Sequence, residues 1–167
     1  PELVSDARLA TIAERRKNPK ADLLSELVKA ESEGQKLSEN ELITTAILLL
    51  NAGHEATVHT IGNGVNALLA LGIKEPITPA TIEEIMRFDA PLHLFTRYAL
   101  EDIEYAGSRF RKGEEVGRML GAANRDPARF EAPDQFIAVR DPNPHVSFGA
   151  GIHFCIGAPL ARLEMLV

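Results

Sequence analysis

One stretch of the chain, residues 148–157, gathers the residue types most able to do chemistry. It holds the only cysteine, Cys155, with His153 two positions before it and three of the twelve glycines. Residues 158–167 predict a helix with Pro159 in its first turn, where a missing N–H group costs nothing. The cysteine would then precede a helix N-terminus, where free N–H groups and the helix dipole favour an anion. A thiolate in such a place is either a nucleophile or a metal ligand.

The plainest alternative is a buried structural cysteine, the usual fate of a lone cysteine. The glycines at 149, 151 and 157 argue against it, because each costs conformational entropy on folding. They are expected where the backbone must pass close to something large and flat. A cysteine-nucleophile hydrolase is a further alternative, but a histidine two residues from the cysteine has poor geometry for a catalytic dyad.

This stretch resembles the haem-binding loop of the cytochromes P-450, whose pattern is Phe-Gly-x-Gly-x-His-x-Cys-x-Gly. All six specified positions are present, as Phe148, Gly149, Gly151, His153, Cys155 and Gly157. The resemblance implies that Cys155 is the axial thiolate of the iron of haem b, which favours O–O cleavage. It also implies that Phe148 and Gly149 bind the haem and that His153 contacts a haem propionate.

The elements that would position this loop include one very long helix. Ser38 and Glu41 form a capping box, apolar residues continue over 43–69, and Gly72 is a plausible end. At about 1.5 Å per residue such a helix would be about 50 Å long. Because it is apolar on most faces, we expect it to run through the middle of the molecule.

Inside this helix, residues 52–57 read Ala-Gly-His-Glu-Ala-Thr. The small residues Ala52 and Gly53 allow another group to approach closely, and Glu55, if buried, needs a reason. A contact of small residues between helices is the alternative. The stretch resembles the family's I-helix motif, which lies over the haem where oxygen binds. That resemblance makes Ala52 and Gly53 haem-lining residues and Glu55 the acid of the proton-delivery pair.

The match to the I-helix motif has one fault, because the family usually has Thr after the acid and this chain has Ala56. The next hydroxyl belongs to Thr57, about 100° further round the helix. We expect Thr57 only to line the pocket. Either a substrate hydroxyl and ordered water replace the missing group, or oxygen activation is poorly coupled to product.

A shorter helix is predicted over residues 80–87, with Glu84 and Arg87 spaced to pair on one face. An exposed pair would contribute less than about 1 kcal/mol. The family's Glu-x-x-Arg motif implies instead a buried structural ion pair, with Arg140 as its third member. The span from Ala56 to Glu84 is shorter than the family pattern, so part of the intervening J-helix region is expected to be missing.

Residues 88–116 predict a small antiparallel sheet, because apolar residues alternate through Ile103, Tyr105, Phe110 and Val116, with turn signals at 106–108 and 112–113. The resemblance implies that Arg97 clamps a haem propionate through two N–H groups. It also implies that His93 lines the substrate pocket or contacts a propionate. An ordinary loop histidine is the alternative for His93.

The remaining segments carry weaker signals. Residues 1–17 predict a helix with a cationic last turn. Residues 22–30 predict a second one, with Asp22 as N-cap and Gly34 past its end. Residues 121–136 are expected to be irregular.

Composition limits the function classes. The 167 residues, 45% hydrophobic and 25% charged, suit one domain with its own core. A net charge of −6 gives no reason to expect a nucleic-acid partner. One cysteine excludes an internal disulfide framework, and no apolar run is long enough for a membrane helix. We expect a soluble, cytoplasmic chain without a membrane segment.

The resemblance covers essentially the whole chain. It implies a mainly α fold with a small antiparallel β-sheet, the C-terminal part of the cytochrome P-450 fold of the bacterial soluble type. Residues 1–167 would run from the end of the G helix to the start of the L helix, with the N-terminal half and the last strands absent. The surface facing that half should then be unusually apolar.

The function implied is that of a haem-thiolate monooxygenase that inserts one oxygen atom from O2 into a small apolar substrate. Its electrons would come from a ferredoxin-type partner that docks near Cys155 and Arg162. Two alternatives stay open. One is that the chain is a non-catalytic haem-binding or folding fragment. The other is a peroxide-using haem-thiolate enzyme, which Ala56 favours.

Overall fold

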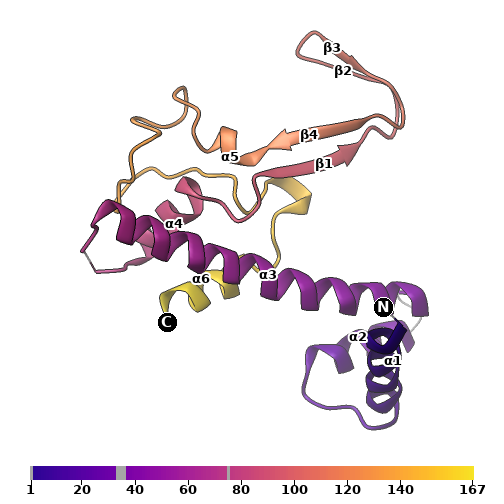
Figure 1. Ribbon diagram of the computed structural model, residues 1–167. Helices are drawn as coiled ribbons and strands as arrows, with labels where there is room; N and C mark the ends of the chain where they lie inside the picture. The colour runs from indigo at the N-terminus through magenta and orange to yellow at the C-terminus, as the bar shows by residue number, and fades with distance from the viewer. Residues whose placement is uncertain (1, 33–36, 75) are drawn as a thin grey trace. The chain divides into compact units, whose positions relative to one another are not determined.

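The computed structural model describes residues 2–32, 37–74 and 76–167. The chain is mainly helical and divides into two compact units, residues 1–54 and 55–167. The long helix α3 (Glu39–Leu71) contributes residues to both and is uninterrupted in Figure 1.

The first unit is built from α1 (Glu2–Lys17), α2 (Leu23–Ser32) and the start of α3. Its core contains Ile12, Val28 and Leu42, one residue from each helix. All residues of this small apolar cluster belong to the first unit.

The predicted cap of α2 is present. Asp22 Oδ1 accepts a hydrogen bond of 2.8 Å from the backbone N–H of Ser25, and Asp22 Oδ2 accepts one of 2.6 Å from Arg15 Nε. These contacts lower the pKa of Asp22 to about 2, and the hydrogen bond from Arg15 has the largest effect. The expected role of Gly34 falls outside the described residues.

Both ends of α3 follow the sequence signals. The backbone N–H of Ser38 donates to Glu41 Oε2 at 2.7 Å, and the N–H of Glu41 donates to Ser38 Oγ at 3.4 Å, so the capping box forms. Gly72 follows the last turn with φ of 65°, a left-handed conformation that favours glycine. These local signals suffice to fix the limits of the helix.

The expected burial of α3 is wrong for this chain. Its apolar residues remain exposed along the part that belongs to the second unit, including Val58, Ile61, Val65 and Leu69. The helix touches its neighbours over a narrow stripe that includes Gly64, which lies against Ile85. An apolar surface of the kind predicted is therefore observed on α3.

The second unit is centred on α4 (Pro79–Phe88), whose buried residues include Ile82, Glu84 and Ile85. Its N-terminus is fixed by a reciprocal cap between Thr78 and Thr81: each backbone N–H donates to the hydroxyl of the other residue. The last helix, α6 (Ala158–Leu166), contacts α4. Helix α4 is thus the element on which the rest of this unit is built.

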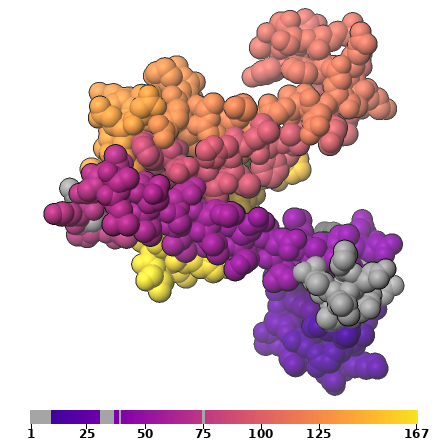
Figure 2. All heavy atoms as spheres, viewed as in Figure 1, coloured from indigo at the N-terminus to yellow at the C-terminus, as the bar shows by residue number. Residues whose placement is uncertain are grey.

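The strands form two two-stranded sheets. In one, β1 (Leu94–Tyr98) pairs antiparallel with β4 (Glu115–Met119). In the other, β2 (Ile103–Tyr105) pairs antiparallel with β3 (Ser108–Phe110). In Figure 2 the salmon-coloured atoms of this hairpin gather at one end of the second unit.

The turn of the β2–β3 hairpin lies at the predicted place. Ala106 and Gly107 both have positive φ, 50° and 77°, which suits the tight turn of a hairpin. One segment differs from expectation, because the stretch predicted to be irregular begins with a short helix, α5 (Leu120–Ala123). Helix α5 is held by a hydrogen bond from the N–H of Gly121 to the carbonyl oxygen of His93.

A three-residue 3-10 helix, η1 (Gly151–His153), lies within the cysteine-containing stretch. Among the residues described, none of the helices combines the length and the apolar character that crossing a membrane requires.

Candidate functional site

The cysteine loop, residues 148–157, is closed by its own backbone. The N–H of Cys155 donates to the carbonyl oxygen of Phe148 at 2.9 Å, and the N–H of Phe154 donates to that of Gly151 at 3.0 Å. Gly149 and Gly151 have φ of 73° and 70°. The turn itself therefore requires glycine at these two positions, in addition to any need for close approach.

Cys155 is exposed and lies three residues before the start of α6. Gly157 is the N-cap of that helix and Pro159 lies in its first turn, as the sequence predicts. The N–H of Ala158 donates to the carbonyl oxygen of Cys155 at 3.3 Å. The thiol is therefore presented at a helix N-terminus, and a buried structural cysteine does not describe it in this chain.

The surroundings of Cys155 fit a flat group held by one protein ligand. Ile152 and Ile156 are 98% and 91% exposed, and a methyl group built on Gly151 would meet no atom within 4 Å. Metal sites made by the protein alone usually need three or four ligands. Among the described residues, no three His, Cys, Asp or Glu side chains gather in that way. A single exposed thiol with an open apolar flank is what haem, which brings four ligands of its own, would require.

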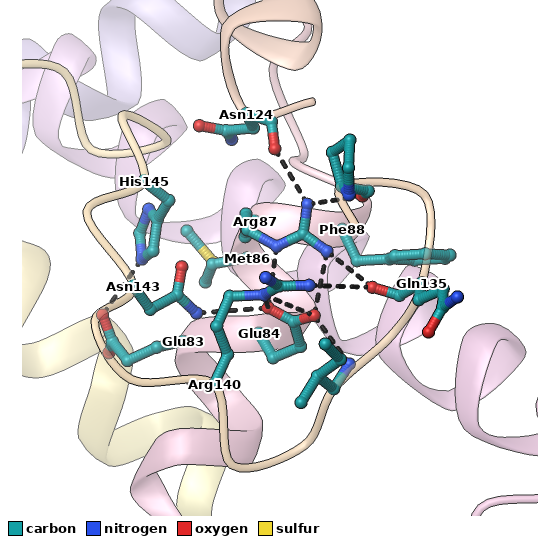
Figure 3. A network of polar contacts seen from close by, with 12 residues as sticks. Glu83, Glu84, Met86, Arg87, Phe88, Asn124, Gln135, Arg140, Asn143 and His145 are labelled. Atoms are coloured by element: carbon teal, nitrogen blue, oxygen red, sulfur yellow. Dashed lines mark hydrogen bonds and ion pairs between the residues drawn. The ribbon is translucent and has the colours of Figure 1, made fainter. Parts of the chain in front are cut away.

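Glu84 and Arg87 form a buried ion pair on α4, shown in Figure 3. Arg87 Nε donates to Glu84 Oε2 at 2.8 Å and Arg87 Nη2 donates to Glu84 Oε1 at 2.9 Å. Arg140 Nε lies 3.2 and 3.1 Å from the two carboxylate oxygens. The structure thus brings together the three residues of the expected network.

The network reaches further than the sequence indicates. Glu84 also accepts hydrogen bonds from the backbone N–H of Ile137 at 2.8 Å and from Asn143 Nδ2 at 3.2 Å. Arg87 Nη1 donates to the carbonyl oxygen of Asn124 at 2.8 Å. One buried carboxylate and one buried guanidinium therefore organise the irregular chain after α5.

Asn124 links this network to the cysteine loop. It is fully buried, its Oδ1 accepts from the backbone N–H of Val146 at 2.8 Å, and its Nδ2 donates to Ser147 Oγ at 2.8 Å. The Ser147 hydroxyl donates in turn to the carbonyl oxygen of Met86 at 2.6 Å. Sequence reasoning missed the role of Asn124. The stretch Asn-Arg-Asp-Pro indicates a turn, but it does not indicate which distant residues the asparagine side chain would contact.

The predicted propionate ligands occupy three separate places. Arg97 lies on β1, donates Nη1 to the carbonyl oxygen of Thr96 at 2.8 Å, and has its guanidinium carbon 5.0 Å from the centre of the Phe95 ring. His93 is exposed, with Nε2 3.3 Å from Asp89 Oδ1. His153 is exposed on η1. Among the described residues, no hydrogen bond or ion pair joins Arg97 or His93 to His153.

The I-helix residues are exposed to different degrees. Ala52 and Gly53 belong to the first unit and are exposed, and a methyl group on Gly53 would meet no atom within 4 Å. The side chain of Glu55 is 76% exposed, with Oε1 3.9 Å from His59 Nε2, so no reason for a buried acid is needed in this chain. Thr57 is half-buried. Glu55 is exposed because the described chain covers only a narrow stripe of α3.

Comparison with known proteins identifies the family. The family model described as cytochrome P-450 matches residues 74–167. The chain belongs to the cytochrome P-450 family. Membership implies a haem group, and the single exposed thiol described above fits one.

The relatives are bacterial. The chain is 44% identical over 160 residues to a putative cytochrome P-450 of Bacillus subtilis, YjiB. The match covers 92% of this chain and 40% of that protein. It is 40% identical to a steroid C26-monooxygenase of Mycobacterium tuberculosis, covering 96% of this chain and 42% of that protein. The chain thus spans about two fifths of the length of these relatives.

Solved structures agree with the fold. The crystal structure of a myxobacterial cytochrome P-450, CYP267B1, in complex with myristic acid superposes with a TM-score of 0.91 at 44% identity, covering 99% of this chain and 43% of that one. A cytochrome P-450 from Bacillus megaterium, CYP109E1, in complex with testosterone gives a TM-score of 0.88 at 38% identity, covering 99% of this chain and 46% of that one.

Proposed function

We propose that the chain carries the haem-binding part of a haem-thiolate monooxygenase, with Cys155 as the axial ligand of haem b. The observation that carries this proposal is the exposed Cys155 thiol at the N-terminus of α6, beside an open glycine-rich loop. Residues 1–167 would then correspond to the segment from the end of the G helix to the start of the L helix. Haem, when bound, supplies the oxidative chemistry.

The residues of this chain would position the haem and its charges. The N-terminus of α6 stabilises the Cys155 thiolate through its free N–H groups and dipole. Phe148 and Gly149 would help to hold the haem. Arg97 and His153 neutralise the propionates, and His93 lines the pocket or contacts a propionate. Because Arg97 uses one Nη1–H on Thr96, its other N–H groups are available for a carboxylate.

Residues of α3 would take part in oxygen activation. Ala52 and Gly53 leave room for O2, and Glu55 delivers protons from solvent, for which its exposed side chain is suited. Thr57 lines the pocket. Position 56 offers no hydroxyl, and its carbonyl oxygen already accepts a 2.8 Å hydrogen bond from Thr60 Oγ1. Water or a substrate hydroxyl must therefore complete the proton path.

The substrate class proposed is a small apolar molecule of the steroid or fatty-acid type. One relative, 40% identical, is named a steroid C26-monooxygenase. Two solved relatives, 38% and 44% identical, contain testosterone and myristic acid. Exposed apolar residues before and within β1, Leu92, Leu94 and Phe95, would contact such a molecule. Electrons would come from a ferredoxin-type partner, in the cytoplasm.

A second candidate is a peroxide-using haem-thiolate enzyme, which Ala56 favours because the usual hydroxyl for oxygen activation is missing. The third is a non-catalytic haem-binding or folding fragment of such an enzyme. The three candidate functions require different co-substrates, so the composition of the reaction mixture distinguishes them.

The test is product formation from testosterone and from myristic acid under three conditions. These are ferredoxin with its reductase and NADPH, hydrogen peroxide alone, and buffer. The monooxygenase predicts hydroxylated product only with the electron donor, and none from Cys155→Ala. Product with peroxide but not with the donor would replace it by the second candidate. If the haem-loaded protein forms no product with the electron donor or with peroxide, the third candidate, the non-catalytic fragment, is supported.

A further inference from the structure

A second polar cluster lies beside the buried Glu84 network. It joins Glu83 of α4 to Arg162 of α6 and to His145, which precedes the cysteine loop. Arg162 Nε donates to Glu83 Oε1 at 2.6 Å and Arg162 Nη2 donates to Glu83 Oε2 at 2.9 Å. His145 Nε2 lies 3.0 Å from Glu83 Oε2, a contact visible in Figure 3. One carboxylate therefore holds a residue before the loop and a residue after it.

The cluster also supports the first residue of the loop. The guanidinium carbon of Arg162 lies 4.6 Å from the centre of the Phe148 ring, and the His145 ring centre lies 6.0 Å from it. The Phe148 ring in turn lies 6.2 Å from that of Phe154, the residue before Cys155. A continuous set of contacts thus runs from Glu83 to the residue next to the thiol.

The charges of the cluster are balanced. The backbone N–H of Ser147 donates to His145 Nδ1 at 3.2 Å, so Nε2 is the nitrogen left to donate to Glu83. Burial lowers the pKa of His145, whose side chain is only 3% exposed, and this favours the neutral ring. Arg162 lowers the pKa of Glu83, and Glu83 raises the pKa of Arg162. The carboxylate and the guanidinium therefore neutralise each other.

We propose that Glu83 is a positioning residue, which fixes the cysteine loop by holding His145 on one side of it and Arg162 on the other. The bidentate contact with Arg162 restricts rotation of α6, whose N-terminus faces Cys155. The contact with His145 fixes the chain just before Phe148. Glu83 thereby controls where the thiol is presented. The spectral part of the test below rests on the proposed function, and the exchange part does not.

The first experiment is hydrogen exchange measured by mass spectrometry on the 167-residue chain. In Glu83→Gln the two N–H groups that close the loop, those of Phe154 and Cys155, should exchange about five- to tenfold faster. The β2–β3 hairpin should be unchanged. The matched control is Glu164→Gln, the same change at an exposed position on α6. Equal exchange in both variants would overturn the proposal.

A second variant keeps the proposal testable if Glu83→Gln does not fold. Arg162→Lys keeps the positive charge but loses the bidentate geometry and the flat contact with Phe148. It should also accelerate exchange in the loop, about threefold, relative to Glu164→Gln. Unchanged loop exchange in Arg162→Lys would count against the proposal as directly as it would for Glu83→Gln.

The spectrum of the haem-loaded protein separates this inference from the proposed function. With carbon monoxide and dithionite, Glu83→Gln should lose at least about half of the absorption near 450 nm to a band near 420 nm, as a displaced thiolate would. If the unmodified protein shows no band near 450 nm, the proposed function fails. If the unmodified protein shows it and Glu83→Gln keeps it as fully as Glu164→Gln does, the positioning role fails.

Discussion

Gly64 of α3 lies against Ile85 of α4, and replacing it tests this contact between the two helices. A methyl group on Gly64 would lie 2.9 Å from Ile85 Cγ2 and 3.0 Å from Ile85 Cδ1, and Ile85 is buried. Overpacking of this kind costs about 1–3 kcal/mol. Alanine in place of glycine returns about 1 kcal/mol in helix propensity. Gly64→Ala should therefore destabilise the chain by about 0–2 kcal/mol.

Gly62 provides the matched control, since it lies on the same helix and a methyl group there would meet no atom within 4 Å. Gly62→Ala should stabilise the chain by about 0.5–1 kcal/mol. Because the propensity gain is common to both variants, the difference between them isolates the contact with Ile85. That difference should be about 1–3 kcal/mol.

The assay is urea unfolding followed by circular dichroism, comparing the midpoints of the two variants at a common slope. A double-mutant cycle adds Ile85→Ala, which removes both clashing methyl groups and should make Gly64→Ala less destabilising by at least about 1 kcal/mol. If the stabilities of Gly62→Ala and Gly64→Ala agree within about 0.5 kcal/mol, the packing of α3 on α4 described here is incorrect.

Three further predictions follow from the site. Glu84→Gln leaves two buried arginines without their carboxylate and should cost about 3–5 kcal/mol in urea unfolding, and a loss below about 1 kcal/mol would contradict the buried network. His145, faced by Glu83, Arg162 and Glu84, has its pKa lowered by burial, so the unfolded state binds its proton first and stability falls as the pH drops below about 6.5. His145→Gln should flatten urea midpoints between pH values of about 7 and 5, and an unaltered profile would assign the dependence to another group. Ala56→Thr should lower the hydrogen peroxide released per product formed, measured by peroxide assay, and an unchanged ratio would show that position 56 does not limit coupling.

The sequence predicted features that depend on local chemistry. The cap at Asp22, the box between Ser38 and Glu41 and the glycine after α3 are each decided within a few residues, and all three are observed. The pairing of Glu84 with Arg87 is local in the same sense, because residues three apart on a helix are neighbours. The family pattern added Arg140, which spacing alone would not have selected.

What could not be predicted depends on partners far apart in the chain. Nothing near Glu83 indicates that it meets His145 and Arg162, and nothing near Asn124 indicates that it meets Val146. The prediction that α3 is buried was wrong for another reason. An apolar helix is buried only where other parts of the chain cover it, and the described chain does not cover the helix at Glu55. Local pattern therefore predicted the elements better than their surroundings.

The central claim is that Cys155 ligates haem iron, and the absorption spectrum of the dithionite-reduced protein under carbon monoxide tests it most directly. If Cys155 is the ligand, a Soret band near 450 nm is expected, and it is lost in Cys155→Ala. A band near 420 nm in the unmodified protein would show haem without thiolate ligation. Failure to bind haem, or a band near 450 nm that survives in Cys155→Ala, would show that Cys155 is not the haem ligand.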